Sequence, residues 1–260
     1  MEIDRTLLPT REQFYRKHVD GPPVLFTRGM EDWPAYRKWS FDWFKEQHGD
    51  VETQTWFTYE ERTVPITIAT YVDRMHAGFA ESGYLGNMDL TALIPGLRDD
   101  LQIPDFAWSR RLTKLNFWLG PRDTLAHLHA DFAHNLFMQI VGRKRVQLIA
   151  PRHSGALLPE RVTWYSAHAG CDQDDGSHER ELPRTPAHIR PDYDFIIEPG
   201  EMFFLPYGWW HRVRSLEPSI SVNYWWLTPA QILKRLPRFA LDELRQRIGR
   251  IPAEPQPNAA

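Results

Sequence analysis

The sequence predicts a mainly β fold, a sandwich or barrel flanked by helices, and three observations support this. From Lys114 to Tyr224, short β-type runs follow one another at close spacing and are separated by turn residues. Before them, amphipathic helical stretches alternate with short apolar runs, and after Trp226 the periodicity becomes helical. The 11 tryptophans in a chain of 260 residues indicate a wide interior lined by aromatic side chains.

Residues 1–113 are predicted to form an N-terminal α/β region. Two stretches, REQFYRKHV and SFDWFKEQHG, have the spacing of amphipathic helices, and PPVLFTRG is a short apolar strand bounded by proline and glycine. Between Thr63 and Gly96 the pattern indicates a strand, then a helix, then a turn that leads to Tyr84 and Leu85.

Residues 114–227 are predicted to form the barrel. Its strands are expected in the runs LNFWLG, NLFMQIVGRKRVQLIAP, FIIEPGEMFFLP, HRVRSL and SISVNYWWL. Gly142 and Arg143 are expected to turn the second run into a hairpin. The polar segment from Arg152 to Pro191 is too long for a tight turn, so we expect it to pass over the barrel mouth, where such loops often hold substrate.

Residues 228–250 are predicted to form two short helices, because Pro237 interrupts the helical pattern. We expect residues 1–250 to form a single domain and residues 251–260 to be a disordered tail. The stretch LDELRQRIGR is a candidate for joining two copies as a homodimer, although ordinary packing onto its own domain explains it equally well.

Composition excludes some classes of protein. The net charge of −3 gives no general attraction to nucleic acid, which argues against a nucleic-acid partner. Cys171 is the only cysteine, so neither an intrachain disulfide nor a cysteine-based zinc site can form. The N-terminus lacks the apolar run of a secretory signal, and no segment approaches the ~18 uncharged apolar residues of a membrane span. We therefore expect a cytoplasmic protein without a membrane partner.

Three candidate metal ligands lie in the stretch TLAHLHADFAHN. His127, His129 and Asp131 occupy alternate positions, and alternate residues of a strand point to the same face. A further ligand must come from elsewhere, and PYGWWHRV supplies His211 at the start of a later strand. Two imidazoles and a carboxylate on one side of a metal suit Fe(II) oxygenases, and zinc hydrolases can use similar ligands. The residues alone therefore indicate a metal site without identifying the metal.

These motifs resemble a known family. The runs HLHADFAHNLFMQIVGRKRVQLIAP, PGEMFFLPYGWWHRV and SISVNYWW closely resemble the JmjC-type, cupin-like 2-oxoglutarate oxygenases of the factor-inhibiting-HIF group. That family has His-x-Asp, Asn, a Lys after a glycine-containing turn, Pro-x-x-Trp-Trp-His and Asn-x-Trp, and this sequence matches each in order. The resemblance spans about Tyr84 to Trp226. It implies a double-stranded β-helix (a jelly-roll, cupin-like barrel) that uses Fe(II), 2-oxoglutarate as co-substrate, and O2.

The resemblance also implies roles for individual residues. His129, Asp131 and His211 correspond to the iron ligands, and Lys144 to the lysine that pairs with the distal carboxylate of 2-oxoglutarate. Outside this context Lys144 would be read as a solvated lysine at a turn. The tryptophans that precede His211 are expected to be packing residues that fix its approach.

Further binding residues follow from the same resemblance. Tyr84 resembles an upstream tyrosine whose hydroxyl meets the distal carboxylate, and Asn135 and Asn223 resemble amides that lie around the ligands, although both asparagines could simply satisfy backbone groups. The family commonly has threonine or serine three residues before the first ligand, where this chain has Ala126. We expect Tyr84 or Thr124 to supply the missing hydroxyl.

The implied activity is hydroxylation of a C–H bond, with release of succinate and CO2, by a 2-oxoglutarate-dependent non-haem iron dioxygenase. A protein or peptide side chain is the favoured substrate, while a small molecule, tRNA or an N-methyl group would use the same chemistry. One alternative is a cupin protein that binds a metal or ligand without turnover, and another is a zinc hydrolase. The His-x-His pattern of ordinary cupins is incomplete here, because the glutamate that usually follows it is missing. His134, His153, His168, His178 and His188 are expected to face solvent.

Overall fold

The computed structural model describes residues 1–57, 62–78, 83–107, 113–157, 159–162, 166–169, 185–186, 188–229 and 231–232. Residues Met1–Trp226 form one compact unit and residues Leu227–Ala260 a second. The first unit contains both sheets and the candidate site, so the fold is described for this unit.

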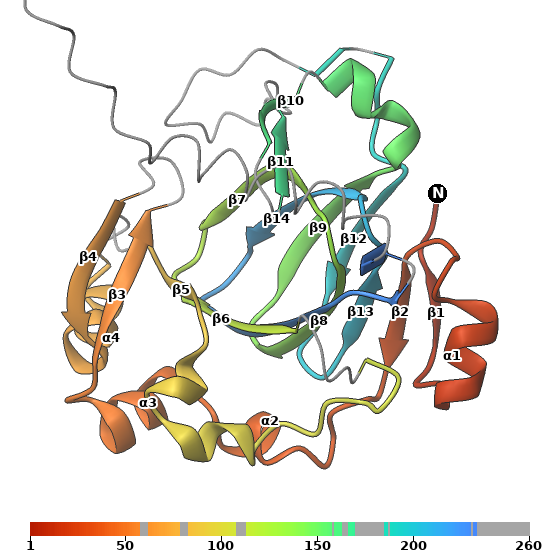
Figure 1. Ribbon diagram of the computed structural model, residues 1–260. Coiled ribbons are helices and arrows are strands. Elements are labelled where there is room, and N and C mark those ends of the chain that lie inside the picture. The colour runs from red at the N-terminus through yellow and green to blue at the C-terminus, as the bar shows by residue number, and fades with distance from the viewer. Residues whose placement is uncertain are drawn as a thin grey trace, which may run out of the picture. The chain divides into compact units, whose positions relative to one another are not determined.

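The larger sheet has nine strands (Figure 1). In spatial order they are β1 (Asp4–Leu7), β2 (Val24–Thr27), β13 (Met202–Leu205), β8 (His134–Val141), β15 (Ser219–Trp226), β6 (Lys114–Gly120), β5 (Tyr84–Met88), β3 (Glu52–Phe57) and β4 (Arg62–Thr67). Only the β1–β2 pair is parallel among these strands. The N-terminal region therefore extends both edges of the sheet.

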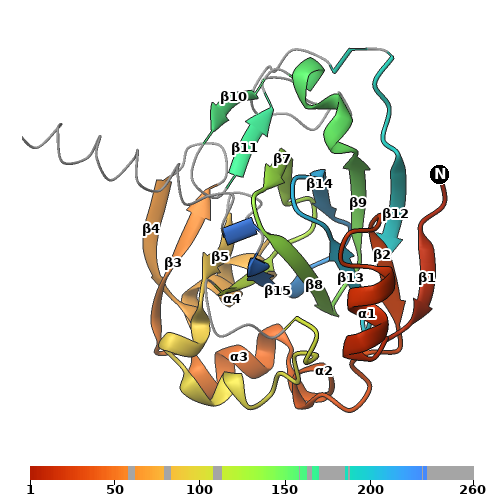
Figure 2. The same cartoon turned by 45° about the vertical axis from the view of Figure 1, so that its right-hand side comes forward.

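The smaller sheet has six antiparallel strands, and it faces the larger sheet in both views (Figures 1 and 2). Their order is β10 (Pro159–Val162), β11 (Ser166–Ala169), β7 (Leu125–Asp131), β14 (Trp210–Ser215), β9 (Lys144–Ile149) and β12 (Tyr193–Ile197). The chain crosses between the sheets from β6 to β7, β7 to β8, β8 to β9, β12 to β13, β13 to β14 and β14 to β15. This topology confirms the predicted mainly β, jelly-roll fold.

The predicted hairpin at Gly142 and Arg143 is wrong, although the turn itself is present. β8 and β9 flank the turn but lie in different sheets, where β8 pairs with β13 and β15, and β9 with β12 and β14. Gly142 has a φ of +69°, and a Cβ there would lie 2.2 Å from the carbonyl oxygen of Pro218. Only glycine fits this turn, which passes the chain from one layer to the other.

The α-helices are α1 (Arg11–Lys17), α2 (Pro34–Lys38), α3 (Phe41–His48) and α4 (Ile68–His76), and the 3-10 helices are η2 (Leu90–Ala92), η3 (Pro95–Arg98) and η4 (Pro151–Leu157). The side chains of Thr10, Ser40 and Thr67 accept hydrogen bonds from backbone N–H groups at the starts of α1, α3 and α4. The predictions of α1, α3, α4 and the strand β2 are confirmed.

Three hydrophobic clusters hold the layers together. The largest lies between the larger sheet and helices α1 to α4, and includes Phe14, Phe44 and Phe117. α2 and α3 lie beneath this sheet in both views (Figures 1 and 2). A second cluster lies between the sheets and includes Phe137, Val146 and Phe203, and a third packs Leu128, Trp210 and Leu157 on the outer face of the smaller sheet. Truncating one such buried ring to alanine typically costs ~3–5 kcal/mol.

Several predicted segments lie largely or wholly outside the described residues. They are the tail over 251–260, the dimerisation candidate LDELRQRIGR, Cys171, His178 and most of the loop from Arg152 to Pro191. Of the predicted helices over 228–250, only the start is described, where Thr228 and Gln231 exchange side-chain-to-backbone hydrogen bonds typical of a helix N-terminus. Among the described residues, no helix has the length and apolar character needed to cross a bilayer.

Candidate metal and dicarboxylate site

A β-bulge in β7 aims the first candidate ligand into the barrel. Ala126 lies opposite Val213 of β14, and His129 lies opposite His211, so three steps along β7 correspond to two steps along β14. The extra residue breaks the alternation, which re-aims the following side chains. The prediction that His127, His129 and Asp131 share one face is therefore wrong for His127, which lies within the bulge.

The structure brings His129, Asp131 and His211 together. One ligand atom from each lies within 4.8 Å of the others. The Nε2 atom of His211 is 3.5 Å from Oδ2 of Asp131, and the Nε2 atom of His129 is 3.9 Å from Oδ1. Among the described residues this is the one group of three such side chains that could hold a metal ion.

Backbone carbonyls orient both imidazoles. Nδ1 of His129 lies 2.6 Å from the carbonyl oxygen of His127, and Nδ1 of His211 lies 3.2 Å from that of Trp209. A carbonyl can only accept, so each Nδ1 carries the proton and each Nε2 keeps a lone pair for a metal. Trp209 and Trp210 pack in two different clusters on either side of the strand start, which confirms their predicted packing role.

The electrostatics of the three side chains favour a cation between them. Asp131 is 3% exposed, and neither of its carboxylate oxygens accepts a hydrogen bond from the described residues. Burial raises the pKa of Asp131 to about 7 and lowers the pKa of His211 well below its usual value. A carboxylate without donors beside two neutral imidazoles fits a divalent metal ion by both charge and lone pairs.

Lys144 is buried, and its side chain has no counter-charge in the part of the chain that the structure describes. Its side chain is 2% exposed, and its ammonium donates a hydrogen bond of 2.9 Å to the hydroxyl of Ser221. The rings of Tyr84 and Phe137 lie 5.3 and 5.5 Å from the ammonium nitrogen. No described carboxylate lies within ion-pair distance, and burial lowers the pKa of Lys144 to about 7. The interpretation of Lys144 as a solvated surface residue is thus wrong.

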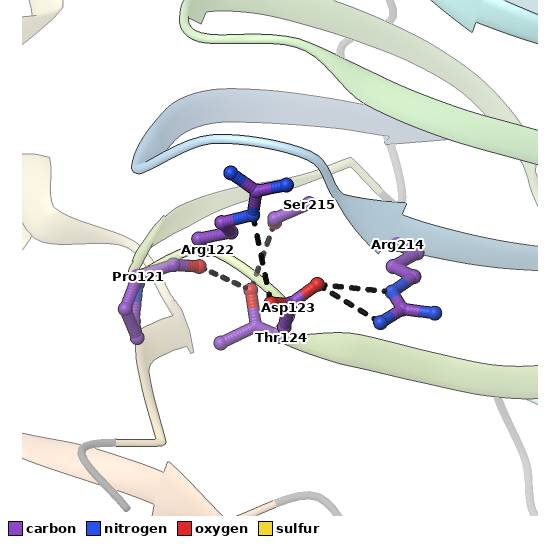
Figure 3. A network of polar contacts seen from close by, with 6 residues as sticks. All are labelled: Pro121, Arg122, Asp123, Thr124, Arg214 and Ser215. Atoms are coloured by element: carbon purple, nitrogen blue, oxygen red, sulfur yellow. Dashed lines mark hydrogen bonds and ion pairs between the residues drawn. The ribbon is translucent and has the colours of Figure 1, made fainter. Parts of the chain in front are cut away.

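Hydroxyl groups surround the end of the barrel that holds Lys144. The Thr124 hydroxyl lies 3.0 Å from the carbonyl oxygen of Pro121, which accepts a hydrogen bond from it, and 2.8 Å from the hydroxyl of Ser215, as Figure 3 shows. The Ser215 hydroxyl also lies 3.4 Å from that of Tyr84 and 3.0 Å from that of Ser219. The structure therefore brings the hydroxyls of both Tyr84 and Thr124 to that of Ser215.

The neighbouring Asp123 anchors the turn that carries Thr124. Its carboxylate accepts hydrogen bonds of 2.9 and 3.2 Å from Arg214 and lies 3.6 Å from the guanidinium of Arg122 (Figure 3). Asp123 has a φ of +68°, which is uncommon for a residue other than glycine. These contacts fix the turn just before β7, so the Thr124 hydroxyl stays beside Ser215.

Three asparagine amides have unmatched polar atoms on neighbouring strands of the larger sheet. They are Asn116 on β6, Asn135 on β8 and Asn223 on β15. Both polar atoms of Asn116 and Asn135, and the oxygen of Asn223, are buried without a hydrogen-bond partner among the described residues. Buried amides are normally satisfied, so these atoms mark a place for a polar ligand or water.

Tyr84 reaches the interior because Gly120 leaves room for its ring. A Cβ at Gly120 would lie 2.8 Å from the ring of Tyr84, which is closer than such contacts allow. Burial raises the pKa of Tyr84, so its hydroxyl stays a proton donor at neutral pH. Ala126 belongs to the cluster between the sheets, so the position that commonly carries a hydroxyl in the resembling family is apolar here.

Some residues of the site were missed or misread from the sequence. Ser215, Ser219 and Ser221 were not singled out, although Ser215 lies an even number of positions after His211 and so shares its face. The prediction of solvent exposure is wrong for His134, which is 3% exposed, whereas His168 is half-buried, with its ring stacked on that of His129 at a centroid distance of 5.5 Å. His188 is exposed, as predicted.

The site thus has two ends of opposite character. The group of His129, Asp131 and His211 offers lone pairs and negative charge, and Lys144 with its hydroxyls offers a cation and donors. His211 and Ser215 are four residues apart on β14, and Lys144 lies opposite Ser215. At about 3.3 Å per residue, the two ends are ~13 Å apart along the backbone. A metal ion at one end and a carboxylate at the other would complement these groups in charge.

Comparison with known proteins supports the same conclusion. The profile of the cupin-like domain matches residues 11–232. Lysine-specific demethylase JMJ30 of Arabidopsis thaliana is 34% identical over 232 residues, which cover 85% of this chain and 53% of that protein. Lysine-specific demethylase 8 of Danio rerio is 30% identical over 240 residues, covering 86% and 58%.

This chain covers most of the length of one human relative. The bifunctional peptidase and (3S)-lysyl hydroxylase JMJD7 of Homo sapiens is 24% identical over 260 residues, covering 84% of this chain and 81% of that protein. By contrast, the chain spans between about half and three-fifths of the length of the two demethylases. These matches confirm the resemblance to JmjC-type proteins that the sequence motifs indicated.

Proposed function

This chain belongs to the cupin-like domain family, and from that premise we propose that it is an Fe(II)- and 2-oxoglutarate-dependent dioxygenase that hydroxylates a C–H bond. One observation carries the proposal. Among the described residues, the buried Lys144 has no counter-anion, and the buried carboxylate of Asp131 in the same barrel has no hydrogen-bond donor. A metal ion and a dicarboxylate would satisfy both charges at once.

His129, Asp131 and His211 are the residues that would hold the iron. When bound, iron and O2 supply the oxidation, in which 2-oxoglutarate becomes succinate and CO2 and one oxygen atom enters a substrate C–H bond. The carbonyls of His127 and Trp209 keep both Nε2 atoms unprotonated and directed at the metal. Because these residues supply three ligands, a metal held by them would have coordination positions left for the co-substrate and oxygen.

Lys144 would bind the distal carboxylate of 2-oxoglutarate. Its ammonium supplies charge, and Tyr84, Thr124, Ser215, Ser219 and Ser221 supply hydroxyl donors around it. A charge-assisted hydrogen bond in a site without water is stronger than one at the surface. Asn135 and Asn223 would donate to the bound groups between the two ends. Tyr84 and Thr124 together replace the hydroxyl that is absent at Ala126.

The favoured substrate is a side chain of a protein or peptide. The relatives named above include a lysyl hydroxylase and lysine-specific demethylases, which supports this substrate class for the chain. A non-catalytic binding protein and a zinc hydrolase are the competing functions. Neither requires a buried lysine ammonium opposite the metal group, so the environment of Lys144 argues against both.

The test is succinate formation by the purified chain with Fe(II), ascorbate, 2-oxoglutarate and a pool of cellular peptides. We expect turnover in the wild type and a loss of at least 100-fold in His211→Ala, because that variant lacks one of three metal ligands. His188→Ala is the matched control, since His188 is exposed. Equal turnover in wild type and His211→Ala, or turnover that persists without O2, would contradict the proposed function.

A further inference from the structure

A polar cleft lies beside the larger sheet. It has a volume of about 480 Å³ and lies where β6 begins, against the segment that contains η2 and η3. Its lining includes Asp89, Arg98, Lys114 and Tyr224. None of these four residues belongs to the metal group or to the hydroxyl pocket described above.

One row of strand residues leads from the cleft across the larger sheet to Asn135, one of the asparagines with unmatched polar atoms. Lys114 of β6 lies opposite Trp225 of β15, and Trp225 lies opposite Asn135 of β8. The ammonium of Lys114 lies 5.4 Å from the ring centroid of Trp225. Neighbouring strands are about 4.8 Å apart, so two spacings put Lys114 ~10 Å from Asn135, or about three residues of an extended peptide.

The charged side chains that face the cleft differ in their surroundings. The Asp89 carboxylate already accepts hydrogen bonds from the backbone N–H (2.9 Å) and the hydroxyl (2.5 Å) of Thr91. Arg98 is exposed at the end of η3, and it pairs with no carboxylate among the described residues. Lys114 adds a second positive charge to the lining of the cleft, which also holds the carboxylate of Asp89.

We propose that this cleft is a substrate subsite that binds an anionic side chain, a carboxylate or a phosphate, about three residues from the residue that is modified. That the bound anion belongs to a substrate rests on the function proposed above, whereas binding of the anion does not depend on turnover. The guanidinium of Arg98 offers paired N–H donors that match carboxylate or phosphate oxygens, and Lys114 offers a point charge. The subsite would thus select acidic or phosphorylated sequences among peptides.

Binding of labelled peptides tests the subsite without any reaction. The probes are fluorescein-labelled octapeptides of sequence GSG-X-X-GSG, where X is glutamate, phosphoserine, glutamine or lysine, measured by fluorescence polarisation. The wild-type chain is expected to bind the glutamate or the phosphoserine peptide at least about 5-fold more tightly than the glutamine peptide. The anionic peptide that binds more tightly shows whether the subsite prefers a carboxylate or a phosphate. The preference should weaken as salt is raised.

Two charge reversals serve as test and control. Arg98→Glu should abolish the preference for anionic peptides, whereas Arg16→Glu, at an exposed helix residue on α1, should retain it. Both side chains are exposed, so the variants are expected to fold, and their melting temperatures check this. An equal preference in wild type and Arg98→Glu would overturn the proposal, as would no preference in the wild type.

Failure of the subsite and failure of the proposed function are separable. Metal-dependent binding of 2-oxoglutarate is measured on the same wild-type samples by calorimetry. Intact binding of 2-oxoglutarate without a preference for anionic peptides overturns the subsite alone. An anion preference that disappears in Arg98→Glu supports the subsite even if 2-oxoglutarate does not bind.

Discussion

The two ends of the barrel interior differ in the sign of their unsatisfied charge. At the metal end, burial raises the pKa of Asp131 to about 7, because a carboxylate without donors is costly in a dry site. At the other end, burial lowers the pKa of Lys144 to about 7, because a buried ammonium group is also costly. The buried charge at each end is therefore costly without a ligand. A bound metal ion would stabilise the charge of Asp131, and the carboxylate of a bound co-substrate would stabilise that of Lys144.

The metal-free protein should show this contrast in its pH-stability profile. Asp131 has a folded-state pKa above its unfolded value, so its contribution to stability falls as pH rises from about 4 to about 7. Lys144 has a folded-state pKa below its unfolded value of about 10.5, so its contribution rises with pH from about 7 to about 10.5. The two ends thus give opposite slopes in separate pH windows.

The largest expected effect is that of Asp131→Asn at the metal end. The affinity for Fe(II), or for Mn(II) as a stable substitute, should fall at least 100-fold, because the only anionic ligand is lost. The metal-free variant should be as stable as the wild type at pH 4 and more stable at pH 7. Calorimetry and thermal unfolding measure the two effects. His127→Ala, in the bulge, should bind metal normally, and an equal loss there would contradict the ligand assignment.

The corresponding change at the other end is Lys144→Met. The affinity for 2-oxoglutarate should fall about 10- to 100-fold, since a charge-assisted hydrogen bond is worth ~1.5–3 kcal/mol. The metal-free variant should be more stable than the wild type at pH 7, and this difference should shrink towards pH 10, because the lysine of the unfolded wild type then also loses its proton. A destabilised variant at pH 7 would show that Lys144 has a partner which the present contacts do not include.

Much of this contrast was predictable from the sequence. The ligands and Lys144 lie in motifs whose residue types and order are distinctive, and the strands have short apolar runs between turns. The bulge was not predictable, because an extra residue in β7 shows only in its register against β14. For the same reason the approach of His168 to His129 depends on the pairing of β11 with β7. Ser215, Ser219 and Ser221 lie on predicted strands, but their role depends on which faces of the two sheets meet.

The hydroxyls beside Lys144 allow a finer test of that end. Thr124→Val and Tyr84→Phe each remove one hydroxyl from the group centred on Ser215, with little change in shape. Each should weaken 2-oxoglutarate binding about 3- to 10-fold, since a neutral hydrogen bond contributes ~0.5–1.5 kcal/mol. Binding by calorimetry is the measurement, with metal affinity as the internal control. A change in metal affinity of the same size would contradict the separation of the two ends.

The smallest effect should come from His168, which supports the metal end from outside the ligand group. Its ring stacks on that of His129 at an interplanar angle of 14°, and it faces His129 across the β11–β7 pair. His168→Ala should lower metal affinity about 2- to 5-fold, because it removes a stacking contact that limits rotation of the ligand ring. His168→Phe keeps a stacking ring without a ligand atom and should retain wild-type affinity. Equal losses in both variants would instead mean that an imidazole nitrogen of His168 takes part in binding the metal.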